Sequence, residues 1–427
     1  MLWRTVLRSS SATWLAPLLA AFVALLLSDD LTNGLTLGYW PSALGAAAFA
    51  LPFVAPACAT AGAWEGSRFT RGNAAHWAPT RSELGIALPL LAPVFVLGAV
   101  GMGVAAALTI SAGRPDGGMP PVGMALVWLV ILAAHAMAGF VLGKRLPLVV
   151  STPLALVLSF VLTAYPAALE PLWLRHMVTG GTSSCCSLDQ APSWQAAASG
   201  VVLALGVIGA CALALTSLRR RARTYLISAA LIAGLVGSGW LAYGLPADPV
   251  SARATDQLQC TGTEPRVCLW PELAQQAAMI RENASDARAR LQRSGLTVPG
   301  ILTMNAHPER GALYIGSWPA PRPSEVRAGV GIALLPPGPP ACARSGGSSP
   351  GADAYEPTAA WLALTAGAEP QVASDRYGQK AAAIAARVRK STHDQQLSWF
   401  NRNNKALRDC TTRPAPLPSS RALETSR

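Results

Sequence analysis

Long runs of apolar residues, separated by short polar segments, occupy positions 1–244 of the chain. A helix that crosses a bilayer takes about 20 mostly apolar residues, and these runs approach or reach that length. We therefore expect seven transmembrane helices in an α-helical, multi-pass membrane domain. Their approximate bounds are 14–27, 43–64, 86–110, 122–142, 146–169, 197–215 and 226–243.

The first run has the length of a signal peptide. Ser28, Asp29 and Asp30 follow it, and they do not offer the small residues of a cleavage site. We therefore expect this run to stay in the protein as a span. In the second run, Pro52 and Pro56 predict a kink or a locally broken helix.

A basic segment, residues 217–225, separates the last two runs and fixes the expected orientation. Four arginines within it cannot lie in hydrocarbon, so the positive-inside rule predicts a cytoplasmic turn. The resulting threading leaves only Arg114 and Arg175 in short outside loops. The inside segments hold Arg4, Arg8, Arg68, Arg71, Arg81, Lys144, Arg145, Arg219, Arg220, Arg221 and Arg223. We expect a bacterial plasma-membrane protein with a cytoplasmic N-terminus and an extracytoplasmic C-terminal domain.

From residue 245 the chain becomes ordinarily polar, and no later apolar run is long enough to span a membrane. We expect a smaller α+β domain over residues 245–412 and a disordered tail over 413–427. Within this domain the pattern predicts helices over 270–292, 357–366 and 379–407, and strands over 311–318 and 327–335.

Composition agrees with a membrane protein: 51% of the residues are hydrophobic and only 13% are charged. The net charge of +12 could indicate a nucleic-acid-binding protein. Many of the arginines flank apolar runs, however, and no basic patch is interleaved with aromatic residues, so we expect lipid contacts and no nucleic-acid partner.

The cysteines follow the expected topology. Cys58 and Cys211 fall within spans, where a thiol packs as a small apolar group. The other six fall in segments predicted to lie outside, where disulfides persist. They are Cys185, Cys186, Cys260, Cys268, Cys342 and Cys410. Spacing alone does not determine the pairing, and our hypothesis joins Cys260 to Cys268 and Cys342 to Cys410.

Three interpretations of the neighbouring pair Cys185 and Cys186 stay open. The two thiols could form a vicinal disulfide, make two bridges to the distal domain, or bind a metal beside His176. A metal site needs more ligands at fixed spacing than this loop offers, so we expect no metal.

Recognisable catalytic chemistry is absent from the sequence, which contains no H-E-x-x-H or phosphate-loop motif. We therefore expect no enzymatic activity and no cofactor. His135 is the only histidine within a span, where an ionisable group is a functional candidate. The alternative is a neutral histidine bonded to a neighbouring helix.

Several short motifs resemble those of a known group of proteins. They are Trp64-Glu-Gly-Ser-Arg68, Ala78-Pro-Thr-Arg81, Cys185-Cys186-Ser-Leu-Asp189 and Val267-Cys-Leu-Trp-Pro-Glu272. With them, the chain resembles multi-spanning actinobacterial membrane proteins that are labelled permease-like components of ABC-2 type exporters. The ABC-2 pattern has six spans, whereas this chain adds a seventh and a large outer domain.

The resemblance implies a permease-type subunit that works with a separate ATP-binding subunit, as a homodimer or with a second permease. Arg68, Arg71 and Arg81 would then border the surface on which the ATPase docks. The alternative is a protein that transports nothing and whose outer domain binds an envelope ligand or a partner.

Overall fold

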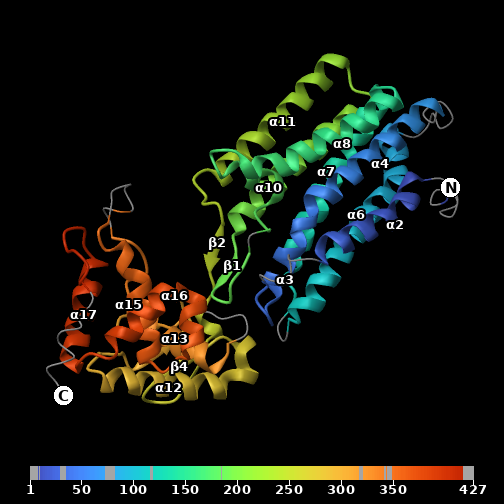
Figure 1. The fold of residues 1–427 in the computed structure, drawn as a ribbon. Coiled ribbons are helices and arrows are strands. Elements are labelled where there is room, and N and C mark those ends of the chain that lie inside the picture. The colour runs from blue at the N-terminus through green and yellow to red at the C-terminus, as the bar shows by residue number, and fades with distance from the viewer. Residues whose placement is uncertain are drawn as a thin grey trace. The chain divides into compact units, whose positions relative to one another are not determined.

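The structure, a computed structural model, describes residues 8, 10–28, 35–72, 82–115, 119–183, 185–316, 321–340, 343 and 349–416. Contacts within the chain divide it into two compact units, residues 1–251 and residues 252–427. Figure 1 traces the chain through both, and each unit is described by itself below. The first is almost entirely helical, and the second combines a small sheet with helices.

Among the described residues, six helical segments of the N-terminal unit are long and apolar enough to cross a membrane. They are α3 (Trp40–Ala47) continued through the 3-10 turn η2 (Ala48–Ala50) into α4 (Leu51–Arg71), then α6 (Glu83–Gly113), α7 (Val122–Arg145), α8 (Leu148–Ala164) with η3 (Tyr165–Ala168), α10 (Trp194–Ala214) and α11 (Arg220–Ala242). These segments fit the multi-pass membrane protein that the apolar runs predict. The first predicted span corresponds to α2 (Ser11–Leu27), an apolar helix of 17 residues.

Two polar segments that the sequence analysis places in turns belong to helices. The predicted inside loop begins at Glu65, but α4 continues to Arg71, so the loop begins only at Gly72. Similarly, α11 begins at Arg220, so most of the arginines of segment 217–225 lie in its first turns. Arginine has a high helix propensity, and a long side chain can extend from the end of a membrane helix towards water.

The break predicted near Pro52 is present just before it. The 3-10 turn Ala48–Ala50 separates α3 from α4, and Pro52 occupies the first turn of α4. In the first turn of a helix the N–H that proline lacks would have no helical partner, so Pro52 is tolerated there. Its ring, however, clashes with a regular helical backbone one turn earlier. By contrast, α4 passes through Pro56 without ending.

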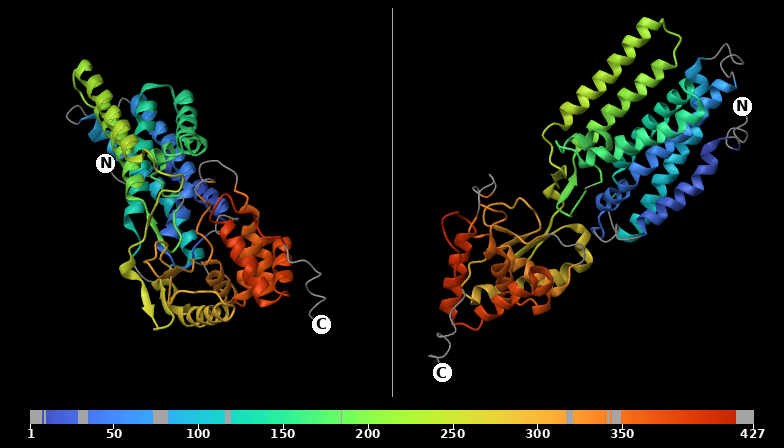
Figure 2. Two further views of the ribbon diagram at one scale, coloured as in Figure 1. Left: turned by 90° about the vertical axis from the view of Figure 1, so that its left-hand side faces the viewer. Right: turned by 45° about the horizontal axis from the view of Figure 1, so that its top comes forward.

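The helices α4 and α7 pack with their backbones against each other, and Figures 1 and 2 show them side by side. Gly62 and Gly66 on α4 face α7, and Gly139 and Gly143 on α7 face α4. A Cβ atom at any of these positions would lie closer than 3.0 Å to a backbone carbonyl oxygen of the other helix. This is the small-residue spacing that lets membrane helices approach closely.

The C-terminal unit contains a four-stranded sheet in the order β3 (Gln259–Thr261), β4 (Arg266–Leu269), β5 (Ile301–Thr303) and β6 (Ala312–Tyr314). The first pair is antiparallel and the other two are parallel. The connection from β4 to β5 runs through the 3-10 helix η5 (Pro271–Gln276) and α12 (Ala277–Arg293). One face of α12 is buried, with Ile280, Ala284, Ala287 and Leu291 at helical spacing.

Further helices among the described residues of this unit are α13 (Pro323–Ile332), α15 (Tyr355–Thr365), α16 (Pro370–Val388) and α17 (His393–Ala406). The helix predicted over 357–366 corresponds to α15, and the strand predicted over 311–318 contains β6. Two short strands, β1 (Gln190–Pro192) and β2 (Val250–Ala252), form a separate sheet. The predicted tail, 413–427, lies outside the described residues except for 413–416.

The strand predicted over 327–335 is wrong, because this segment lies largely in α13. Pro323 occupies the first turn, and the backbone N–H of Arg322 donates to Glu325 at 2.9 Å, which caps the helix. The buried Val326 and Val330 are four residues apart, on one helical face. Capping at the N-terminus therefore outweighs the strand preference of the β-branched residues.

The single helix predicted over 379–407 consists of parts of two helices. The chain leaves the helical path after Val388, and Thr392 begins α17 by donating its backbone N–H to Gln395 at 3.2 Å. The first of the two also starts earlier than predicted, at Pro370, and Gly378 interrupts it with φ 83°. Glycine adopts this left-handed conformation without the penalty that a side chain would bring.

We expect Gly143→Ala to destabilise the N-terminal unit, by about 1–3 kcal/mol, because the added methyl group overpacks the contact between α4 and α7. Gly123→Ala on the same helix is the matched control, since a Cβ atom there meets nothing within 4 Å. Thermal unfolding in detergent, followed by circular dichroism, measures both variants. Equal melting temperatures for the two would contradict the packing that we describe.

Candidate functional site

A buried carboxylate, that of Glu65, holds the start of α2 against the end of α4. Glu65 is 1% exposed, and its Oε1 accepts hydrogen bonds from the Ser10 hydroxyl at 3.1 Å and the Ser11 backbone N–H at 3.0 Å. Arg68, one turn further along α4, donates to its Oε2 at 3.0 Å. A carboxylate at a helix N-terminus also interacts favourably with the helix dipole, so this buried charge is fully partnered.

The three arginines of the proposed docking surface therefore differ in their surroundings. Arg68 is engaged with Glu65 inside the unit. Arg71 is exposed at the last position of α4, and no hydrogen bond or ion pair of its side chain is found among the described residues. Arg81 lies outside the described residues. Sequence reasoning missed Glu65, although a lone acid at the end of an apolar run is a recognisable signal.

Further polar contacts link the helix ends near Glu65. Lys144, near the end of α7, forms an ion pair with Glu83 at the start of α6. The Thr70 hydroxyl donates to the Lys144 carbonyl oxygen at 3.2 Å, and the Ser67 hydroxyl donates to that of Gly143 at 3.0 Å. The start of α2 and α6 and the end of α4 and α7 therefore meet at one end of the bundle, which carries many basic residues.

The candidate His135 on α7 lies against α8. Its Nδ1 is 2.8 Å from the hydroxyl of Ser159. The hydroxyl of Ser159 can either donate or accept here, so the contact suits a neutral imidazole. This geometry matches the alternative of a histidine bonded to a neighbouring helix.

In the loop before α10, Cys185 and Cys186 form a disulfide with each other. They are buried against α3, because a Cβ atom on Gly45 would lie closer than 3.0 Å to the Cys185 carbonyl oxygen. The Cys186 carbonyl oxygen accepts from the Thr36 hydroxyl at 3.3 Å. The vicinal pair therefore docks this loop onto the N-terminal part of the bundle.

The same loop contains the short helix α9 (Leu174–Thr179), in which His176 is 1% exposed. Its Nε2 is 2.8 Å from the carbonyl oxygen of Pro246, just after α11, so the neutral ring donates there. Its Nδ1 is buried without a partner among the described residues. Burial lowers the pKa of His176. The hydrogen bond to Pro246 and the charge of Asp248 act in the opposite direction, whereas the charge of Arg175 lowers this pKa further.

In the C-terminal unit, Cys260 and Cys268 face each other across β3 and β4 and form a disulfide. The proposed pairing of Cys342 with Cys410 stays a prediction, because Cys342 lies outside the described residues. Beside the sheet, Arg253 forms an ion pair with Glu272 at 2.8 Å and lies 4.4 Å from the centre of the Trp270 ring. These contacts tie the start of the unit to its sheet.

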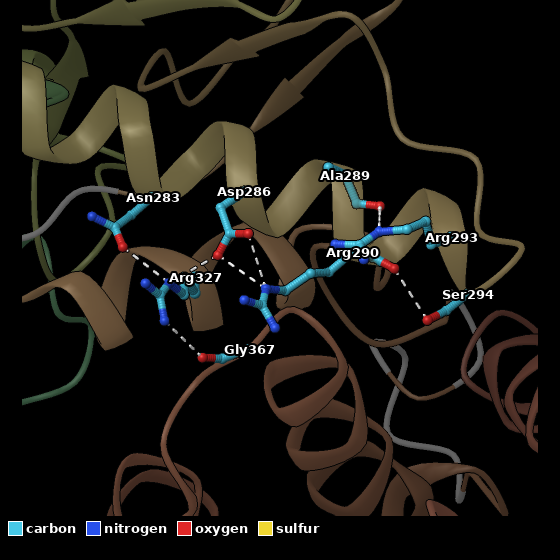
Figure 3. A network of polar contacts seen from close by, with 8 residues as sticks. All are labelled: Asn283, Asp286, Ala289, Arg290, Arg293, Ser294, Arg327 and Gly367. Atoms are coloured by element: carbon cyan, nitrogen blue, oxygen red, sulfur yellow. Dashed lines mark hydrogen bonds and ion pairs between the residues drawn. The ribbon is translucent and has the colours of Figure 1, made fainter.

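A polar network joins three helical segments of this unit (Figure 3). Arg327 on α13 donates through Nε to the Asn283 side chain of α12 at 2.9 Å and through Nη1 to the carbonyl oxygen of Gly367 at 3.2 Å. Asp286 lies 3.4 Å from the same Nε and also accepts from Arg290. Each charge of the network has a partner within it, so its role is to fix α12, α13 and the turn after α15.

A cavity of about 910 Å³ lies in the C-terminal unit, beside β6 and α13. Its wall is mostly apolar, and Arg376 on α16 is the one charged side chain among the described lining residues. These are Ala306, Pro308, Ala312, Leu313, Tyr314, Ile315, Gly316, Gly329, Ile332, Ala333, Leu335, Pro336, Pro337, Gly338, Pro339, Pro340, Ala343, Ser349, Ala352, Tyr355, Arg376 and Leu407. The volume lies in the range of roughly 300–1,000 Å³ that is typical of small-molecule sites.

Next to Arg376, the hydroxyl of Tyr377 is buried and has no hydrogen-bond partner among the described residues. Burial raises the pKa of Tyr377 to about 12, against the effect of Arg376 and together with that of Tyr355, a residue of the cavity wall. Tyr377 is therefore a neutral, buried hydroxyl, and it is not itself one of the described lining residues. An unpartnered buried polar group usually indicates a missing partner.

Neither unit offers a metal site within the residues that the structure describes, since no cluster of three histidine, cysteine or acidic side chains is found there. Of the three interpretations of Cys185 and Cys186, the structure agrees with the vicinal disulfide. Sulfur atoms bonded to each other cannot also form two bridges to the distal domain or act as thiol ligands of a metal.

We expect stability to fall as the pH is lowered below about 6.5, because unfolded His176 binds a proton near its ordinary pKa whereas the folded form binds it only at lower pH. His176→Gln, which keeps a donor, should flatten the dependence of the melting temperature on pH between about 7.5 and 5. His393→Gln, at an exposed position, is the matched control and should leave the dependence unchanged. An unaltered slope in His176→Gln would contradict the assignment to this residue.

Part of the chain matches a known family. Residues 267–410 match the family described as "Domain of unknown function (DUF7224)". This range contains the sheet from β4 onward, the Arg327 network and the described lining of the cavity. No curated protein and no solved structure matches the chain.

Proposed function

We propose that the chain is a membrane-anchored binding protein whose C-terminal domain holds a small molecule in the cavity beside β6 and α13. The observation that supports this function is the cavity itself, about 910 Å³ with a mostly apolar wall and one charged residue. Such a combination of apolar surface and few polar groups is typical of ligand sites. The binding domain would lie outside the plasma membrane.

The outside location is supported by charge and by connectivity. The ends of α4 and α7 and the start of α11 carry Arg71, Arg145 and Arg221, so one end of the bundle is strongly basic. By the positive-inside rule this end would face the cytoplasm. Since α11 starts at that end, the chain would leave the bundle at the opposite, outer face.

Polar contacts within the spans support a binding role more than a transport path. His135 is bonded to Ser159, and Ser67 is bonded to Gly143 and lies 3.3 Å from Ser151. These side chains satisfy one another between helices, as in a tightly packed bundle. A path for a polar substrate would instead need groups that face water.

We expect Ala333→Trp to fill the cavity and displace its occupant, because Ala333 lies in the cavity wall. The full-length protein is purified from its native membrane, and small molecules extracted from it are compared by mass spectrometry. A compound that accompanies the wild type should be strongly depleted in Ala333→Trp. Ala383→Trp, at an exposed position on α16, should retain it. Identical extracts from wild type and Ala333→Trp would contradict the proposal.

A second candidate is the permease-type subunit that the resemblance to ABC-2 exporters implies, with a separate ATPase. The exposed Arg71 at the basic end favours it, because this side chain is available for an acidic partner. Arg68 is not equivalent, since its loss would leave the buried Glu65 without its positive charge.

For this candidate we expect an ATPase to co-purify with the tagged protein from native membranes and to be lost in Arg71→Ala. Arg387→Ala, an exposed arginine of the C-terminal domain, serves as the control. Mass spectrometry and an ATPase assay of the purified material give the result. Recovery of the protein without any ATPase would rule out this candidate and leave the binding function.

A further inference from the structure

The residues that line the cavity of the C-terminal domain indicate a class of ligand. Leu313, Ile315 and Ile332 contribute aliphatic surface, and a proline-rich segment, residues 335–340, contributes more. Arg376, on α16, supplies the charge. The wall therefore combines a long apolar surface with a single cationic group.

Arg376 is available for a ligand. It is exposed, and its guanidinium forms no hydrogen bond or ion pair that involves another described residue. Glu325, which interacts electrostatically with Arg376, accepts hydrogen bonds from the backbone N–H and the guanidinium of Arg322 at 2.9 and 2.7 Å. A guanidinium without an internal partner pairs well with a carboxylate or phosphate, to which it can donate two parallel hydrogen bonds.

The neighbouring phenols add polar groups close to this charge. Tyr355 lines the cavity, and the buried hydroxyl of Tyr377 has no described partner. Oxygen atoms of an anionic headgroup accept hydrogen bonds, so the phenol of Tyr355 in the cavity wall can add a donor to that of Arg376. By contrast, a cationic headgroup would meet the charge of Arg376 unfavourably.

We propose that the cavity binds an anionic amphiphile, with an alkyl chain along the aliphatic wall and a carboxylate or phosphate at Arg376. This inference rests on the proposed binding function and names the class of its ligand. The shared chemistry of the head is a negative charge, which a free fatty acid or a phosphate-bearing lipid would supply.

The experiment uses the full-length protein in nanodiscs and a set of photoactivatable probes. All carry the same long alkyl chain with a diazirine, and they differ only in the headgroup: carboxylate, phosphate, alcohol or trimethylammonium. After illumination, peptide mapping records labelling within residues 306–316 and 329–340. Mapping separates probe in the cavity from probe dissolved in the bilayer.

We expect saturable labelling of these peptides, about tenfold stronger for an anionic head than for the alcohol, since only the anion forms charge-assisted hydrogen bonds with Arg376. Arg376→Met should reduce labelling by the anionic probes to that by the alcohol, and Arg376→Lys should retain most of it. Arg387→Met, on the same helix, should change nothing. The stronger of the two anionic probes identifies the headgroup.

Equal labelling by all headgroups, or no effect of Arg376→Met, would overturn the anionic ligand while leaving a cavity that binds apolar molecules. If no probe labels the cavity peptides of the wild type, the proposed binding function fails as well. Labelling that prefers trimethylammonium would overturn the role of Arg376.

Discussion

The contact between α4 and α7 determines how the N-terminal unit is built. In a bilayer the lipid tails are as apolar as leucine, so burial of apolar side chains does little to bring helices together, and close packing has to do so. Glycines on both helices remove the side chains that would hold them apart. The two backbones come close enough for the Ser67 hydroxyl to reach the carbonyl oxygen of Gly143. About 67% of the most apolar part of the α3–α4 segment is buried in the unit, whereas only 17% of that of α11 is, so α11 lies at the edge of the bundle.

The C-terminal domain is held together by covalent and polar links around a small sheet. Its strands are three or four residues long, so the sheet alone offers few ladder hydrogen bonds. The disulfide between Cys260 and Cys268 closes the antiparallel pair, and Trp270 donates from its buried ring to the Met304 carbonyl oxygen at 3.2 Å. Arg327 then connects α12 to the segment after α15. Covalent and polar links thus hold together a domain whose sheet is small.

The sequence predicted the features that depend on local composition. Apolar runs gave the helices of the first unit, and Pro52 indicated the break before α4. The strand expected over 327–335 lies largely in α13, because the apolar residues of this segment suit a strand as well as a helix. The contact between Arg322 and Glu325 at its start favours the helix. The pairing of Glu65 with Ser10 joins residues 55 positions apart, and the cavity takes its wall from segments between Ala306 and Leu407. No local pattern contains such contacts, so the partners of Glu65 and the cavity could not be predicted, although the lone acid itself is a recognisable signal.

The helices of the N-terminal unit differ greatly in length. At 1.5 Å per residue, the 17 residues of α2 extend over about 25 Å, less than the roughly 30 Å of a hydrocarbon core, whereas the 31 residues of α6 exceed it. Trp14, Leu18, Phe22 and Leu25 form an exposed stripe along α2. Because Glu65 fixes the start of this helix, α2 cannot slide to compensate. In a bilayer that α2 crosses, this mismatch would be met by thinning of the lipid beside the stripe or by snorkelling of the flanking residues.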